Sequence, residues 1–111
     1  MFEVEMIRKT AKDYPGIIRD AAPEVLEAGS AMVQADAKHL APVDTGTLRS
    51  SIVREVKGNI AIVGTNVEYA PYVEYGTKRS RAQPFLRPAI DRNRRRIIRM
   101  MAEKIRQAGR G

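Results

Sequence analysis

Hydrophobic and polar positions change their period along the chain, and two segments have the pattern of a helix. A long N-terminal helix is predicted from about Ile17 to Leu40, with apolar positions at Val25, Leu26, Met32, Val33 and Leu40. Pro23 is expected to restart this helix, because proline is tolerated in a first helical turn but disrupts an interior one. A second helix is predicted from Pro84 to about Gln107, where one stripe is apolar, with Leu86, Ile90, Ile97, Met101 and Ile105.

Between these helices the pattern has the shorter period of β-strands. Residues 51–57 alternate apolar and charged side chains, residues 60–63 are a compact β-branched run, and Gly58-Asn59 between them is a two-residue hairpin signal. Residues 2–7 also alternate and predict a short strand, with a frayed helical start as the alternative. The sequence therefore predicts an α+β fold: a long N-terminal helix, a small antiparallel sheet built on a β-hairpin, and a C-terminal basic helix, with the helices on one face of the sheet.

Residues 69–77 carry aromatic side chains at every third position. The segment fits a short helical turn or a further strand with its proline at an edge, and the sequence leaves both open. Its tyrosines could pack in the core or form an assembly surface, since tyrosine is favoured at interfaces. The polar, basic segment 78–83 is predicted to be an exposed, flexible loop. Candidate interface residues are Tyr69, Tyr72, Glu74, Tyr75, Lys78, Arg79 and Arg81.

Turn chemistry marks the ends of the predicted elements. The block that begins at Pro42 stops the first helix, and its Asp44, Thr45 and Gly46 can turn the chain sharply from helix into strand. Glycine and threonine after the last tyrosine can act in the same way, and two prolines flank the first core anchor of the last helix. The structural motif positions are Pro42, Asp44, Thr45, Gly46, Gly76, Thr77, Pro84, Phe85 and Pro88.

The length and composition limit what the chain can be. With 111 residues, 43% of them hydrophobic, residues 1–111 are expected to form a single domain. The absence of Cys excludes disulfides, thiolate zinc sites and cysteine nucleophiles. No apolar run approaches the roughly 20 residues needed to cross a bilayer, and the acidic start is unlike a signal peptide. A soluble protein made in a cytoplasm is expected.

Positive charge is concentrated in the last third of the chain. Residues 1–77 hold 8 Lys and Arg against 11 Asp and Glu, whereas residues 78–111 hold 12 against 2. A basic segment of this kind can serve nucleic acid, an acidic neighbouring subunit or solubility. The arginines lie around much of the helix, and no recognised DNA-binding motif frames them. The candidate basic face consists of Arg92, Arg94, Arg95, Arg96 and Arg99.

Three sequence blocks, in a fixed order, form a combined motif. They are Ala41-Pro42-Val43-Asp44-Thr45-Gly46-Thr47-Leu48-Arg49-Ser50-Ser51-Ile52, then Tyr69-Ala70-Pro71-Tyr72-Val73-Glu74-Tyr75-Gly76-Thr77, then Gln83-Pro84-Phe85-Leu86-Arg87-Pro88-Ala89. Together they look like the tail-component family of lambdoid-type phages, which is named after gene product ten of a well-studied siphophage. The similarity covers nearly the whole chain, and the first 15 residues and the last few are the least informative.

The resemblance implies a structural protein of virion assembly at the head-to-tail junction or the tail end, as a tail-completion, terminator or connector component. It implies a homo-oligomeric ring, a hexamer in such families, that contacts other phage neck or tail proteins. The expected location is the virion, after synthesis in the host bacterial cytoplasm. The resemblance implies no catalytic activity and no cofactor, so its motif positions carry over only as structural or interface candidates.

Particular residues also bear on other functions. A small basic nucleic-acid-binding protein is the main alternative, with non-specific DNA contact through the basic helix. Asp44-Thr45-Gly46 also matches the aspartic protease signature, but helical patterns flank it where that all-β enzyme has strands. His39 lacks partners at metal-ligand spacing, so an exposed helix-terminal role is favoured over a metal site. Glu68 and Glu74 could form a carboxylate pair, but a surface or interface role is favoured.

Overall fold

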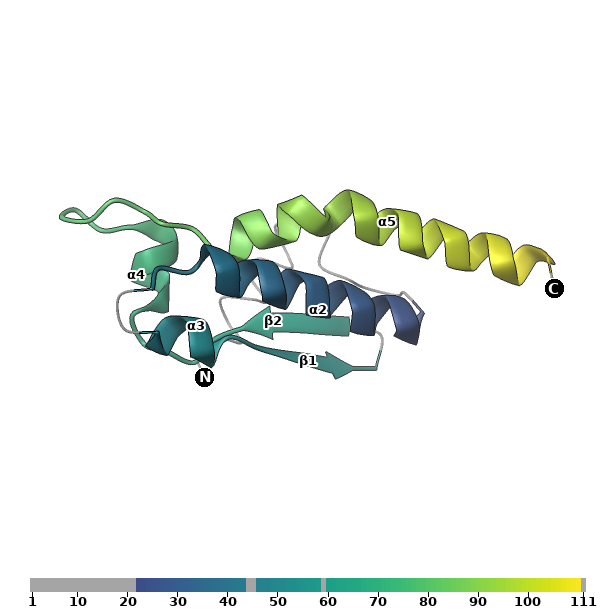
Figure 1. Ribbon diagram of the computed structural model, residues 1–111, viewed down its shortest axis with the longest axis horizontal. Helices are drawn as coiled ribbons and strands as arrows, with labels where there is room; N and C mark the ends of the chain where they lie inside the picture. The colour runs from purple at the N-terminus through teal and green to yellow at the C-terminus, as the bar shows by residue number, and fades with distance from the viewer. Residues whose placement is uncertain (1–21, 44–45, 59, 111) are drawn as a thin grey trace.

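The computed structural model describes residues 22–43, 46–58 and 60–110. Its elements follow in the order α2 (Pro23–Leu40), α3 (Thr47–Ser51), β1 (Val53–Lys57), β2 (Ile60–Gly64), α4 (Ala70–Tyr75) and α5 (Leu86–Arg110). In the view of Figure 1 the hairpin, α2 and α5 follow one another across the molecule, which confirms the predicted α+β fold. The strand predicted at residues 2–7, the helix start predicted at residues 17–21, and Asp44 and Thr45 lie outside the described residues.

Helix α2 confirms the predicted long helix from Pro23 onwards. Pro23 lies in its first turn, where its missing N–H is one of the groups that have no intrahelical partner anyway. The helix ends at Leu40 because Ala41, which precedes Pro42, has extended backbone angles of φ −64° and ψ 137°. One stripe of the helix is buried, consisting of Val25, Leu26, Gly29, Ser30, Val33 and Ala37.

A short helix, α3, lies where the sequence was expected to turn directly into a strand. Gly46 adopts the left-handed region with φ 73°, as its role in the turn requires, and α3 begins at the next residue. Leu48 and Ile52 are both buried, and their separation of four residues places them on one side of a helical turn. The prediction of a strand from Ser51 was therefore wrong at its start, since β1 begins at Val53.

The β-hairpin confirms the clearest strand prediction. β1 and β2 pair antiparallel in a register that places Val53 opposite Gly64 and Lys57 opposite Ile60. Gly58 in the connection has φ 56°, a conformation that favours glycine in hairpin turns. The sheet of the described residues has these two strands, because residues 70–75, for which a strand had been an alternative, form α4.

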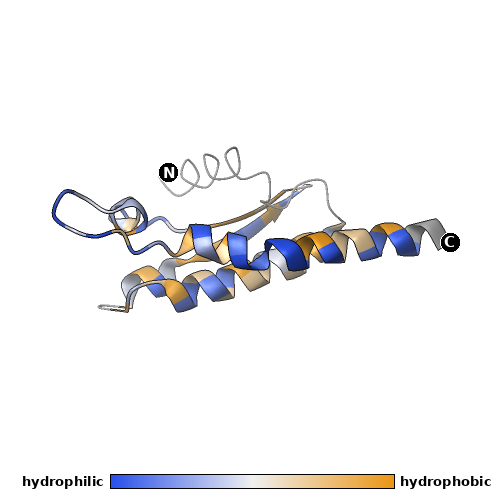
Figure 2. Ribbon diagram, turned by 90° about the horizontal axis from the view of Figure 1, so that it is seen from above, coloured by the Kyte–Doolittle hydropathy of each residue, from blue (hydrophilic) through white to orange (hydrophobic). Residues whose placement is uncertain are grey.

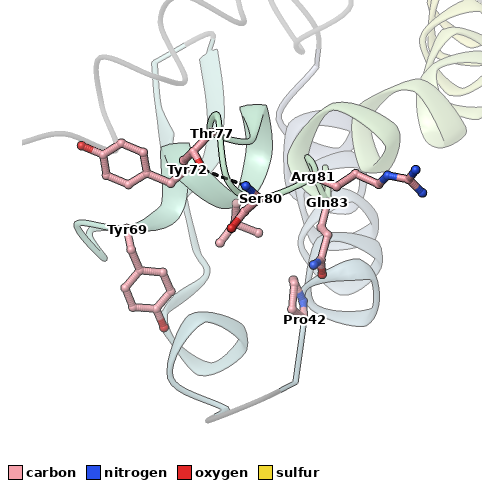
Figure 3. Close-up of a pocket in the computed structure, with 8 residues that line it drawn as sticks. Pro42, Tyr69, Tyr72, Thr77, Ser80, Arg81 and Gln83 are labelled. Carbon is pink, nitrogen blue, oxygen red and sulfur yellow. Dashed lines mark hydrogen bonds between the residues drawn. The ribbon is translucent and has the colours of Figure 1, made fainter.

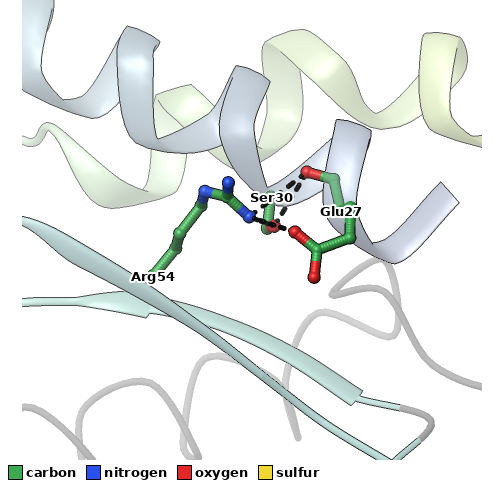
Figure 4. Close-up of polar contacts among 3 residues, drawn as sticks. All are labelled: Glu27, Ser30 and Arg54. Atoms are coloured by element: carbon green, nitrogen blue, oxygen red, sulfur yellow. Dashed lines mark hydrogen bonds and ion pairs between the residues drawn. The ribbon is translucent and has the colours of Figure 1, made fainter. Parts of the chain in front are cut away.

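Helix α2 covers one face of the hairpin. Arg54 extends from β1 to α2, where its Nη1 lies 2.7 Å from Glu27 Oε2 and donates to Ser30 Oγ at 3.2 Å (Figure 4). Both members of the ion pair are partly exposed, so it contributes at most about 1 kcal/mol. The larger contribution comes from the buried side chains of β2 that face α2, Ala61 and Val63.

Helix α5 packs along α2 through its first half and extends beyond it (Figure 1). It begins at Leu86, two residues after the predicted start, with Phe85 fully buried just before it and Pro88 in its first turn. Most of the predicted apolar stripe is buried or half-buried, as expected. The prediction fails at Ile105, whose side chain is 71% exposed because the end of the helix lies beyond the core.

Candidate functional site

Helix α4 and the loop after it lie at one end of an elongated molecule that measures 56 × 23 × 23 Å (Figure 1). Ala70 anchors α4 in the core with its side chain fully buried. Tyr69, Tyr72 and Tyr75 are 42%, 62% and 54% exposed, so they are not core residues. The structure thereby removes the core alternative that the sequence had left open for these side chains.

Glu74, one of the candidate interface residues, has a different position. Its side chain is buried, with 4% exposure, and its carboxylate accepts three backbone N–H bonds from the start of α5. Oε1 accepts from Phe85 and Leu86, each at 3.0 Å, and Oε2 accepts from Arg87 at 3.2 Å. These donors belong to a helix N-terminus, where a negative charge is favoured. Glu74 therefore connects α4 to α5.

The suggested carboxylate pair does not fit this geometry. Glu68 is exposed just before α4, whereas both carboxylate oxygens of Glu74 are bonded to backbone N–H groups inside the fold. A pair of carboxylates that divides acid and base roles needs both groups at a common site that a substrate can reach. The buried capping position of Glu74 does not provide such a site.

The loop at residues 76–83 folds back on α4 through backbone hydrogen bonds. Gly76 has φ 78°, and a Cβ atom there would lie only 2.7 Å from the backbone nitrogen of Ala82. The N–H of Thr77 donates to the carbonyl of Ser80 at 2.9 Å, and the N–H of Gln83 donates to the carbonyl of Val73 at 2.8 Å. Exposure of residues 78–83 was predicted and is confirmed, while their flexibility stays a prediction.

A small open pocket lies between the loop, α4 and the end of α2 (Figure 3). Its volume is about 210 Å³, below the roughly 300 Å³ at which pockets for drug-sized ligands begin. Its lining mixes tyrosine rings with hydroxyl, amide and guanidinium groups. This size and lining suit a single side chain of a neighbouring protein. The lining residues are Pro42, Tyr69, Tyr72, Val73, Thr77, Ser80, Arg81 and Gln83.

The arginines of the candidate basic face spread around α5, as expected from the sequence. Arg96 lies against α2, where its Nη1 is 3.6 Å from the sulfur of Met32, and Arg94 is half-buried. Arg92, Arg95 and Arg99 are exposed. Arg94 is thus the one half-buried member of the five, and the other four, Arg96 included, are exposed.

The structure also bears on His39 and on the block around Asp44, the remaining candidates for metal or protease chemistry. His39 is exposed in the last turn of α2, and in the described part of the chain no three His, Asp or Glu side chains group as a metal site. Helices α2 and α3 flank the Asp44 block, whereas the catalytic Asp of an aspartic protease lies between strands. No helix of the described segments is long and apolar enough to cross a membrane.

A comparison with protein families confirms the family that the three sequence blocks suggested. Residues 5–76, about two thirds of the chain, match the model of a family described as "Bacteriophage HK97-gp10, putative tail-component". The chain belongs to this family. As a member of it, the protein is a phage tail-related structural protein. No curated protein and no solved structure matched the chain in the corresponding searches.

The family match includes α2, the hairpin and α4, and ends at Gly76. The first of the three sequence blocks lies within it, and the second does so except for its last residue, Thr77. The block at residues 83–89 and the whole of α5 lie after the matched segment. The basic helix is therefore a feature that this family member carries outside the matched region.

Proposed function

We propose that this family member is a non-enzymatic, ring-forming subunit that acts at the head-to-tail junction or the tail end of the phage particle. In this role identical copies, six by family resemblance, surround the tail tube and contact the neighbouring neck or tail proteins. The role requires complementary surfaces and no catalytic step. The proposed role includes the tail-completion, terminator and connector positions, because a ring of identical copies around the tail tube fits each of them.

The observation that carries the proposal is the exposed surface at α4. We call Tyr69, Tyr72, Tyr75, Lys78, Arg79 and Arg81 the α4 surface; all six are exposed. Tyr72 and Tyr75 on the six-residue helix α4, with Tyr69 at its N-cap, give a dense group of large side chains with polar tips, and tyrosine is enriched at protein interfaces. Rigid positions lower the entropy lost on association, and the Glu74 cap holds α4 against the body of the protein.

The position of the α4 surface supports a contact that repeats from copy to copy. It lies at one end of an elongated molecule, while the end of α5 lies at the other (Figure 1). A surface at one end that binds a different surface of the next copy makes a heterologous interface, which closes into a ring when the rotation between copies allows it. The pocket beside Tyr72 offers a place for one side chain of that neighbour.

Imaging of phage particles tests the proposal. Virions from a strain in which the gene is disrupted should show separate filled heads, with unattached or abnormally long tails, beside a normal complemented control. Complementation with the intact gene shows that the defect comes from this gene and not from an effect of the disruption on neighbouring genes. Fully joined, infectious particles from the disrupted strain would sink the proposed role.

A further inference from the structure

Four exposed arginines form a line along the outer side of α5. Arg92, Arg95, Arg99 and Arg106 follow one another at intervals of three, four and seven residues. At 3.6 residues per turn, these positions fall within about 60° of one another around the helix axis. The buried residues of α5 lie on roughly the opposite side of the axis. We call the four residues the arginine line.

The arginine line is long and nearly straight. At 1.5 Å per residue, Arg92 and Arg106 are separated by about 21 Å along the helix axis, and Arg92 and Arg99 by about 10 Å. Figure 2 shows hydrophilic positions gathered in the loop before α5 and in its central turns. The positive charge of the arginine line is therefore spread along the axis of α5 and is not concentrated at one position.

Most of this charge is not neutralised within the described residues. Arg106 pairs with Glu103, with 3.0 Å between Nη2 and Oε2. The other three arginines of the line form no ion pair with a described carboxylate. Like charges three and four residues apart on a helix repel one another. A polyanion that follows the helix would relieve this repulsion.

The arginine line lacks the apolar core that a protein-binding surface of this size would have. Protein interfaces have an apolar core with charge at the rim, but the arginine line contains no exposed apolar side chain. Ile98 and Ile105 are 55% and 71% exposed, yet they lie about 90° and 110° around the helix from the centre of the line, and Ile98 is about 60° from Arg95, its nearest member. A protein that binds apolar surface would therefore approach α5 from another side.

The chemistry of arginine fits phosphate groups. Its planar guanidinium donates two parallel N–H bonds to phosphate oxygens and stays charged at any physiological pH. The spacing of about 10 Å between Arg92 and Arg99 is close to the roughly 12 Å width of the major groove of B-DNA. Long flexible side chains at this spacing can contact phosphates on both sides of a groove.

We propose that the arginine line binds the phosphate backbone of double-stranded DNA without reading its base sequence. Arginine can also bond the edge of guanine, but the line has no amide side chain for adenine and no recognised DNA-binding motif frames it, so we expect phosphate contacts that position DNA and do not specify sequence. This inference goes beyond the assembly role. It does not depend on ring formation, because the purified chain is sufficient to test it.

Fluorescence anisotropy with a labelled duplex of about 30 base pairs tests the inference, at salt concentrations from about 50 to 200 mM. The test variant combines Arg92→Gln, Arg95→Gln and Arg99→Gln. The matched control combines Lys78→Gln, Arg79→Gln and Arg81→Gln in the loop, which removes the same number of charges. All six positions are exposed, and circular dichroism verifies that each variant is folded.

We expect the intact chain to bind the duplex with an affinity that falls steeply as salt rises. The α5 variant should bind at least about tenfold more weakly at low salt, and its log–log salt slope should be shallower by about two to three. The loop variant should change affinity by less than about threefold. Equal losses in both variants would show that net charge alone is responsible and would overturn the assignment to the arginine line.

Two further results would overturn the inference. The first is an intact chain that shows no salt-dependent binding at low salt. The second is an α5 variant that binds DNA like the intact chain but fails to restore joined particles in the disrupted strain, which would assign the arginine line to an acidic neighbouring protein. In contrast, loss of DNA binding with normal complementation would support the inference and leave the assembly role standing.

Discussion

Asn93 of α5 donates its side-chain amide to the carboxylate of Asp36 on α2, with 2.6 Å between Nδ2 and Oδ2. The same nitrogen donates to the carbonyl of Ala89 at 2.8 Å, and Asn93 is buried with 4% exposure. This residue interrupts the apolar stripe of α5 with a polar group that fixes how the helix is rotated against α2. The pair thereby joins the two longest helices at one defined point.

Replacing Asn93 with Ala should lower the free energy of unfolding by about 1 to 3 kcal/mol, because Asp36 loses its partner and a cavity forms. Urea denaturation followed by circular dichroism measures the loss. Gln107→Ala, at an exposed position on the same helix, serves as the control and should change stability by less than about 0.5 kcal/mol. Similar values for the two variants would contradict a role of Asn93 in helix packing.

Glu74→Ala should be strongly destabilising, by about 2 to 4 kcal/mol, because three N–H groups at the start of α5 lose their acceptor. Glu74→Gln should recover part of this loss, since its amide oxygen can still accept while the negative charge is gone. The exposed Glu68→Ala is the control. The cap would be refuted if Glu74→Ala unfolded at the same urea concentration as Glu68→Ala.

Gly76 and Gly58 both have a positive φ, of 78° and 56°. Alanine at Gly76 combines backbone strain with a contact of 2.7 Å to the nitrogen of Ala82, whereas alanine at Gly58 meets open space. Gly76→Ala should therefore lower stability by about 2 to 4 kcal/mol and Gly58→Ala by about 1 kcal/mol. Thermal unfolding measures both, and a larger loss at Gly58 would contradict the close approach of the loop.

Two isoleucines on α5 should respond very differently to truncation. Ile97 is 3% exposed and packs in the core, so Ile97→Ala should cost about 2 to 4 kcal/mol of stability. Ile105 is 71% exposed, so Ile105→Ala should change stability by less than about 0.5 kcal/mol. Denaturant unfolding of both variants measures the difference. A comparable loss at Ile105 would mean that it packs against something in the folded monomer.

Joint replacement of Tyr72 and Tyr75 with Ser should leave the monomer stable and block assembly. Both side chains are more than half exposed, so the change in unfolding free energy should stay within about 1 kcal/mol. Complementation of the gene-disrupted strain should nevertheless fall sharply, as measured by plaque counts and negative-stain imaging. Normal complementation by this variant would remove the tyrosines from the proposed interface.

The sequence predicted those elements whose local signals agree with their packing. α2 has proline in its first turn, an apolar stripe and a proline after its end, and the hairpin has a glycine turn between an alternating segment and a β-branched run. α3 was missed because its five residues are too few to establish a helical period. Its structure depends on the burial of Leu48 and Ile52 in the tertiary core, which no local pattern reports.

The candidate site shows the same limit. The sequence left the three tyrosines open between core packing and an assembly surface, and their exposure is consistent with a surface. Glu74 was grouped with them because it lies between them in the sequence. Its carboxylate instead bonds to residues 11 to 13 positions later, a relation fixed by how α4 meets α5. The available signals were a glutamate just before a loop and a helix start flanked by prolines after it. Sequence alone does not show that the glutamate contacts this helix start.

The exposure of Ile105 indicates that the local stability of α5 is not uniform along its length. The first half of α5 is held by the core, whereas its last turns have their own backbone hydrogen bonds and the exposed Arg106–Glu103 ion pair, and so short a helical segment is marginal in water. The free energy of local opening should therefore fall steadily from Ile97 towards the C-terminal end of α5. Arg106 belongs to the part that opens most readily, so a bound polyanion would shift the helix–coil equilibrium of these last turns towards the helix.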